Sequence, residues 1–156
     1  MKIAIVHDWL TGMRGGEKCL EVLCTLYPSA DLFTLLHIPG SVSSIIESHS
    51  IHTSFIQNLP FVESKYRYYL PLMPLAIERF NFQKYDLIIS SSHCVAKSVK
   101  PRSGSLHICY CHTPMRYIWD QFDQYFCITK SGLIPWVIMK LLRPLFQRWD
   151  SKTSSR

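Results

Sequence analysis

The sequence predicts an α/β protein in which a parallel β-sheet is flanked by helices. Short, continuously apolar segments, such as those at 3–7 and 86–90, are typical of strands buried on both faces of a sheet. Segments in which apolar residues recur at helical spacing separate these strands along the chain. Because strands that alternate with helices are joined by right-handed crossovers, we expect a parallel, Rossmann-like sheet.

The first half of the chain is expected to form three strands and one helix. The strand at 3–7 is followed by a helix that begins near Gly16 and ends before Pro28, since apolar residues recur there at helical spacing. A second strand is expected at 31–37 and a short third strand at 51–53.

The middle of the chain combines an interrupted helix with two further strands. The segment 63–80 has a helical pattern but carries Pro71 and Pro74, which predicts two pieces or one kinked helix. Strands are expected at 86–90 and 106–111, each followed by a polar loop.

The last expected element is a long apolar and basic helix at 133–149. We therefore assign one domain to residues 1–150, lacking its last elements, and a polar tail to 151–156. Two stretches, 65–70 and 136–148, mix aromatic, apolar and basic residues. Such mixtures suit a helix lying on an anionic membrane or a helix packed on the sheet with its charges in water, and packing is the favoured interpretation.

The composition limits the possible partners and compartments. The net charge of +6 is compatible with nucleic acid, anionic lipid or phosphorylated substrates, and also with ordinary solubility. No nucleic-acid recognition motif accompanies the charge, so we expect no nucleic-acid partner. No apolar run approaches the ~18 residues of a membrane-spanning helix. The apolar stretch at 3–6 is too short for a secretory signal, and several cysteines lie in apolar segments, so we expect a reducing, cytoplasmic compartment.

Three loops are expected to meet at one edge of the sheet. They are the segments 8–16, 90–94 and 112–117, and each follows a predicted strand. Ligands of open parallel sheets bind at the carboxyl ends of the strands, so these loops are where we look for a site.

The first of these loops carries two glycines immediately before a helix. Gly15 and Gly16 allow the backbone to approach a ligand closely, and the partial positive charge of the helix N-terminus favours phosphate. Glu17 and Lys18 lie in the first helical turn. The spacing matches neither the dinucleotide nor the nucleoside-triphosphate loop, so the residues alone leave open a phosphate contact and a tight connection without a ligand.

The other two loops contribute histidines. His112 follows its strand directly, where it can donate to a phosphate or polarise a sugar hydroxyl. His93 holds the equivalent place after another strand, and Ser92 beside it can bind a ligand or cap a helix. Cys109 and Cys111 have poor spacing for zinc and are interpreted as core thiols, so no metal site is expected.

Four segments resemble the family 4 glycosyltransferases of bacteria. They are 2–18, 71–79, 85–93 and 111–117, and they occur in the family's order. The resemblance implies two Rossmann-like domains facing each other across a cleft, of which this sequence is similar to the amino-terminal, acceptor-side half. It implies transfer of a sugar from a nucleotide-sugar donor to a polysaccharide or lipid-linked acceptor. It also implies retention of anomeric configuration, no cofactor, and in many members a peripheral position on the inner membrane.

The resemblance also implies roles for individual residues. Gly15 and Gly16 match the family's glycine loop near the donor diphosphate and the acceptor, and Glu17 belongs to that motif. His112 matches the histidine near the reacting sugar, which makes it the candidate catalytic residue, and Arg116 is a candidate phosphate or acceptor contact. The carboxyl-terminal domain that binds the nucleotide in the family is not represented. We therefore expect this chain alone not to catalyse transfer at an appreciable rate.

Two other functions stay open from the sequence. A small nucleotide-binding α/β domain would carry a G-x-G-x-x-G fingerprint, which this sequence lacks. A non-catalytic remnant or partner-binding module would need none of these motifs.

Overall fold

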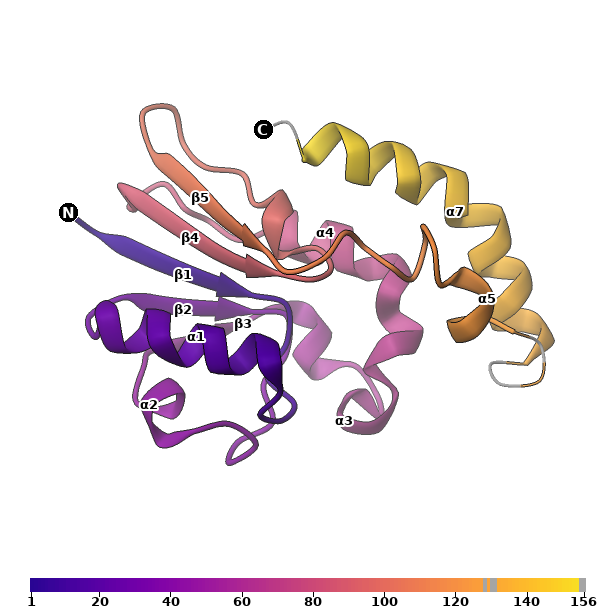
Figure 1. Cartoon of the computed structure of the whole chain (residues 1–156), viewed down its shortest axis with the longest axis horizontal. Coiled ribbons are helices and arrows are strands. Elements are labelled where there is room, and N and C mark those ends of the chain that lie inside the picture. Colours follow the sequence, from indigo (N-terminus) through magenta and orange to yellow (C-terminus); the bar gives the residue numbers. More distant parts are fainter. Residues whose placement is uncertain (128, 130–131, 155–156) are drawn as a thin grey trace.

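The computed structural model contains a five-stranded, all-parallel sheet and describes residues 1–127, 129 and 132–154 (Figure 1). The strand order is β3-β2-β1-β4-β5, so the first strand lies in the middle. The strands are β1 (Ile3–His7), β2 (Asp31–Thr34), β3 (Ile51–Thr53), β4 (Leu87–Ser92) and β5 (Leu106–Cys111). The predicted α/β class with a Rossmann-like parallel sheet is confirmed.

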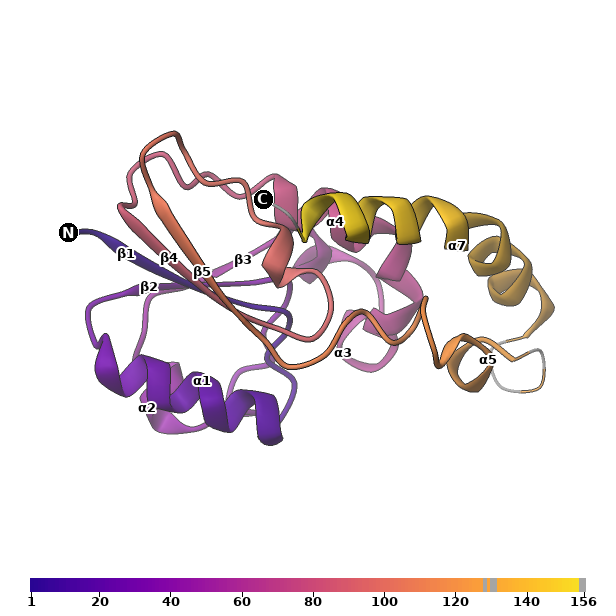
Figure 2. The same cartoon turned by 45° about the horizontal axis from the view of Figure 1, so that its top comes forward.

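Helices lie on both sides of this sheet. Helices α1 and α2 lie on one side, and α4 and the C-terminal part of α7 lie on the other (Figure 2). The α-helices are α1 (Gly15–Leu26), α2 (Ser44–Glu47), α3 (Val62–Lys65), α4 (Met73–Glu78), α5 (Phe122–Tyr125) and α7 (Leu133–Thr153). The 3-10 helices are η1 (Phe55–Asn58), η2 (Tyr66–Leu72) and η3 (Ala96–Ser98).

The register of the central strands produces a core on each face. Ile5 of β1 pairs with Leu32 of β2 and with Ile89 of β4. Ile5 and Leu32 pack with Leu20 and Cys24 of α1, which closes the smaller core. Since side chains alternate along a strand, the neighbours of these residues point to the larger core on the opposite face.

Two strand ends differ from the prediction. The second strand ends at Thr34 rather than at residue 37, because the chain turns there and the Leu35 N–H donates to the carbonyl oxygen of Asp8. β4 continues through Ser92, so the stretch after Ser90 that was expected to be a loop belongs to the sheet. The loop after β4 therefore begins at His93.

The segment predicted as one kinked helix or two pieces forms three short helices, α3, η2 and α4. Pro71 lies within η2, and Pro74 lies in the first turn of α4, where its missing N–H is not needed. The prolines thus break the helix as expected, with one more break than predicted.

The helix expected at 133–149 extends further than predicted, into the polar segment that begins at residue 151. α7 continues to Thr153, whose buried hydroxyl accepts a hydrogen bond from Ser98 Oγ at 2.7 Å. A polar sequence here is therefore packed against η3, and residues 155–156 lie outside the described part of the chain. Within that part, no helix has the length and hydropathy needed to cross a membrane.

The prediction that Cys109 and Cys111 are core thiols is wrong. Cys24 and Cys94 are buried, whereas Cys109 and Cys111 are exposed. The reason is that β5 is the outermost strand, so its side chains lack the neighbours that cover a central strand.

Candidate functional site

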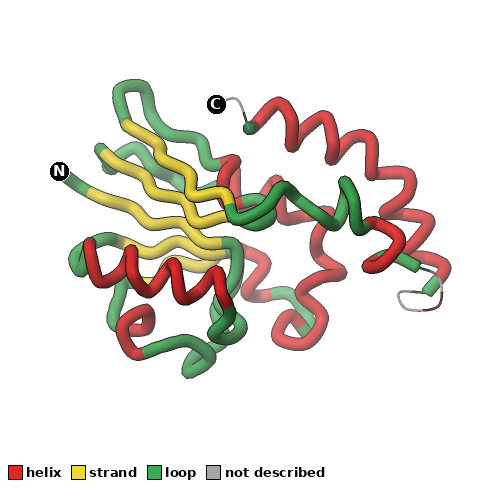
Figure 3. The backbone as a smooth tube through the Cα atoms, viewed as in Figure 1, coloured by secondary structure: helices red, strands yellow, loops and turns green. Residues whose placement is uncertain are grey.

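The carboxyl ends of β1, β4 and β5 point to the same edge of the sheet, where the connecting loops leave it (Figure 3). A pocket of about 350 Å³ opens there. Its lining residues are Trp9, Arg14, Gly15, Gly16, Glu17, His93, His112 and Thr113. The structure thus brings together residues from all three loops that the sequence predicted to meet.

The glycine loop forms one wall of this pocket. Glu17 Oε2 accepts the backbone N–H of Arg14 at 3.0 Å, which closes the first turn of α1. The first N–H groups of a helix have no partner within the helix, so this end offers donors and a partial positive charge to an anion. A Cβ atom on Gly16 would lie 3.6 Å from His7 Cε1 and 3.8 Å from His112 Nε2. Glycine therefore leaves the space beside both rings open.

Asp8, which sequence reasoning missed, holds the loop that follows β4. Its Oδ2 accepts the N–H groups of His93 and Cys94 at 2.7 and 3.0 Å. Its Oδ1 accepts those of Val95 and Ala96 at 2.7 and 2.8 Å. Burial raises the pKa of this fully buried carboxyl, but the electrostatic interactions with His93 and His7 and the N–H donors outweigh it and leave the pKa below its ordinary value. The signal available in the sequence was an aspartate directly after a buried strand.

His93 is oriented by the same carboxylate. Its Nδ1 lies 3.2 Å from Asp8 Oδ2, and its ring meets the edge of the Trp9 indole with centroids 4.6 Å apart. Because one nitrogen faces a fixed carboxylate, the ring is held at the pocket wall rather than free to rotate.

His112 is linked to two buried residues, Ser91 and His7, that were not among the predicted site residues. Its Nε2 lies 2.9 Å from Ser91 Oγ, and the same hydroxyl lies 3.2 Å from His7 Nδ1. His7 Nε2 lies 3.7 Å from Glu17 Oε1. Glu17, His7, Ser91 and His112 therefore form a continuous polar chain from the glycine loop to the end of β5.

The two ends of this polar chain, His112 and Glu17, differ in charge: the ring favours its neutral form and the carboxyl is ionised. Burial lowers the pKa of His112, and the nearby rings of His7 and His93 lower it further, so its imidazole favours the neutral form. Burial raises the pKa of Glu17, but the interaction with His7 and the backbone N–H donors bring it below the ordinary value, so this carboxyl is ionised at neutral pH.

Ser92 is the first predicted site residue that does not line this pocket. It is fully buried and pairs with Cys111, on the opposite face of the sheet from Ser91.

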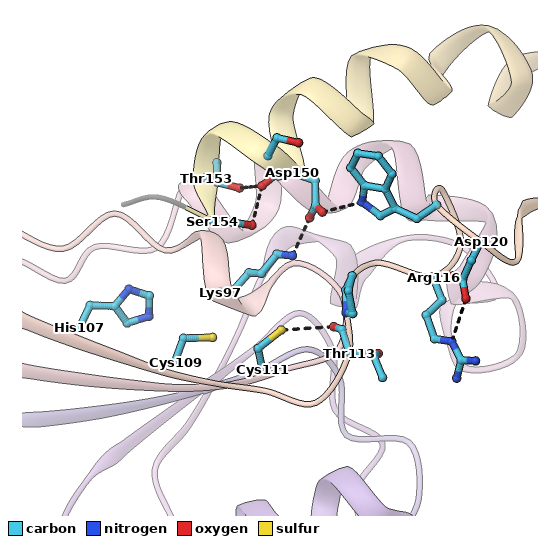
Figure 4. Close-up of a pocket in the computed structure, with 13 residues that line it drawn as sticks. Lys97, His107, Cys109, Cys111, Thr113, Arg116, Asp120, Asp150, Thr153 and Ser154 are labelled. Atoms are coloured by element: carbon cyan, nitrogen blue, oxygen red, sulfur yellow. Dashed lines mark hydrogen bonds and ion pairs between the residues drawn. The ribbon is translucent and has the colours of Figure 1, made fainter.

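Arg116 lies in a second, larger cavity of about 1100 Å³, between β5 and the end of α7 (Figure 4). Its Nε is 3.8 Å from Asp120 Oδ2. Beside it, the buried Lys97 Nζ lies 2.8 Å from Asp150 Oδ1. Thr113 lines both cavities, so Arg116 is near the first pocket along the chain but not part of its wall.

Metal ligation receives no support from the side chains that the structure describes. No three of their His, Cys, Asp or Glu groups are placed to hold one ion. His107, which shares a strand face with Cys109 and Cys111, instead has its Nε2 2.8 Å from Ser90 Oγ.

The fold and the pocket define a Rossmann-like α/β protein with a polar site at the carboxyl edge of its sheet. Comparisons with protein-family models, curated proteins and solved structures found no match to this chain.

Proposed function

We propose that this chain supplies the acceptor-side half of a retaining glycosyltransferase, which moves a sugar from a nucleotide-sugar to a polysaccharide or lipid-linked acceptor. The observation that carries the proposal is the pocket at the carboxyl edge of the sheet, where Gly15, Gly16 and Glu17 face His93 and His112. These are the residues for which the sequence resemblance implies donor and acceptor contacts.

The chemistry of the pocket agrees with this role. A diphosphate needs hydrogen-bond donors and positive potential, which the N-terminus of α1 provides. A sugar needs polar side chains at its rim, which His93 and His112 provide. In the proposed enzyme a second domain forms the facing wall and binds the nucleotide, and transition-state charge is stabilised from both sides.

Saturation-transfer NMR tests the proposal on the purified chain with a panel of nucleotide sugars and glycosyl diphosphates, because this half is proposed to contact the sugar and the diphosphate rather than the nucleotide. We expect saturation on the sugar protons, and we expect it to weaken in Gly16→Val, whose side chain enters the space beside His7 and His112. His112→Ala weakens it as well. His52→Ala is the matched control, because His52 lies on β3, the outermost strand at the opposite end of the strand order from β5, and does not line the pocket.

The same experiment separates the alternatives. Saturation confined to the nucleotide base, unchanged in both pocket variants, would favour a small nucleotide-binding domain. No saturation from any donor, with the fold intact by circular dichroism, would leave the glycosyltransferase proposal without a ligand and favour a partner-binding module.

A lipid-linked acceptor would also require contact with a membrane surface, and α7 offers one. Its exposed apolar residues are Leu133, Ile134, Val137, Ile138, Leu141 and Leu145. Lys140 and Arg148 on the same helix can meet anionic headgroups. We expect co-sedimentation with phosphatidylglycerol vesicles that Leu141→Glu reduces, whereas Val22→Glu, at an exposed apolar position on α1, leaves it unchanged. Equal loss in both variants would argue against α7 as the contact.

A further inference from the structure

Ser91 lies between two histidine rings, and a hydroxyl has only one hydrogen to share between them. Its Oγ is 3.2 Å from His7 Nδ1 and 2.9 Å from His112 Nε2. Ser91 is fully buried, and among the described residues these are its two side-chain hydrogen bonds, so its hydrogen finds an acceptor only when it donates to one of the rings. The oxygen then accepts from the other ring, and the direction of one hydrogen bond sets the direction of the next. Glu17, His7 and Ser91 are each at least 97% buried, so water does not compete for the hydrogen bonds between them.

The group that sets the direction is Glu17. Its Oε1 is the charged atom nearest to His7 Nε2, at 3.7 Å, and that nitrogen has no hydrogen-bond partner among the described residues. A carboxylate attracts an N–H and repels a nitrogen lone pair, which favours the proton of a neutral His7 on Nε2. Nδ1 is then a lone pair that accepts the hydrogen of Ser91.

The consequence passes to His112. With its hydrogen given to His7, Ser91 Oγ accepts from His112, so the proton of His112 lies on Nε2 and its Nδ1 carries the lone pair. We infer that Glu17, His7 and Ser91 are positioning residues that hold His112, which lines the pocket, in the Nε2–H tautomer with its Nδ1 as a hydrogen-bond acceptor. Such a nitrogen binds a hydroxyl hydrogen of a sugar rather than a phosphate oxygen.

Two further residues at this edge of the sheet, Gly16 and Asp8, lie near the rings of His7 and His112. We call Glu17, His7, Ser91 and His112 the relay. Gly16 lies beside the rings of His7 and His112 and, having no side chain, leaves the space next to them open. Asp8, the other buried carboxylate of this edge, accepts four backbone N–H groups and lies beside His93. Among the described residues, the carboxylate in ion-pair distance of His7 is that of Glu17. Only the last step, the contact with a sugar hydroxyl, rests on the proposed function.

Long-range ¹H–¹⁵N NMR on the ¹⁵N-labelled full chain, at a pH where the rings are neutral, reads the tautomers directly and needs no ligand. We expect protonated Nε2 and unprotonated Nδ1 on both His7 and His112. Glu17→Gln presents an amide N–H to His7 and is expected to invert both rings, with the proton moving to Nδ1 of each. Ser91→Ala breaks the link, so His112 becomes a mixture of tautomers while His7 keeps its Nε2 proton.

Ser90→Ala is the matched control, because Ser90 is the neighbour of Ser91 on β4 but contacts His107 on the other face. It is expected to alter the His107 signals and leave those of His112 unchanged. An Nδ1-protonated His112 in the wild-type chain, or a doubly protonated His7, overturns the inference even if no variant folds. Failure of nucleotide-sugar binding with the expected tautomers present would count against the proposed function and not against the relay.

Discussion

Replacing Asp8 with asparagine tests whether one buried carboxylate organises the site. The two oxygens of Asp8 accept four backbone N–H groups at 2.7 to 3.0 Å. An asparagine has one acceptor oxygen, and its NH₂ group would face two of these donors. Each buried donor left without an acceptor costs about 1–3 kcal/mol, so we expect the free energy of unfolding to fall by about 2–6 kcal/mol. That is a large part of the stability of a single domain.

Urea denaturation followed by circular dichroism measures this change. Asp120→Asn is the control, because Asp120 is exposed and its Oδ2 lies 3.8 Å from Nε of the partly exposed Arg116. We expect that control to stay within about 0.5 kcal/mol of the wild type. A loss below about 1 kcal/mol in Asp8→Asn, equal to the control, would refute the reasoning that the carboxylate holds the loop after β4.

The pH dependence of stability provides a second readout for the same residue. The pKa of Asp8 in the folded chain lies below its unfolded value of about 3.9. The contribution of Asp8 is therefore fully present above about pH 4 and is lost as the pH falls through the folded-state pKa. We expect the wild type to lose this increment on acidification and Asp8→Asn to lack it. The same acid slope in both proteins would contradict the assignment.

Two further predictions follow from buried groups elsewhere in the structure. Lys97→Met leaves Asp150 as a buried carboxylate without its ion-pair partner, so we expect the free energy of unfolding to fall by about 3–5 kcal/mol in urea titrations. The control is Lys100→Met, which removes an exposed lysine and is expected to lower the free energy of unfolding by less than about 1 kcal/mol. Equal costs would show that burial does not decide the strength of these pairs. Burial raises the pKa of Cys24 to about 12 and that of Cys94 well above its ordinary value, so we expect iodoacetamide to label both only after unfolding, as read by mass spectrometry. Rapid labelling of either thiol in the native chain would count against its burial.

Much of the fold followed from local patterns in the sequence. The strand at 3–7, the strand at 106–111 and the helix expected to begin near Gly16, which begins at Gly15, were predicted because strand and helix periodicities are local properties of the chain. The meeting of three loops at one edge followed from the rule that parallel strands place their carboxyl ends together. Gly15, Gly16, Glu17, His93 and His112 were therefore predicted from sequence and are brought together by the structure.

Tertiary structure decided what periodicity does not encode. Whether a strand is central or outermost depends on the order of strands in the sheet, which is why Cys109 and Cys111 are exposed although their sequence is apolar. Long-range pairing also places the carboxylate of Asp8 beneath backbone donors more than 80 positions away, and Ser91 between the rings of His7 and His112. Sequence by itself determined that the loops carrying the two glycines, His93 and His112 meet at the carboxyl edge of the sheet. Which side chains form hydrogen bonds with one another was decided by the packing of separate segments, because a hydrogen bond depends on distances that only the assembled sheet fixes.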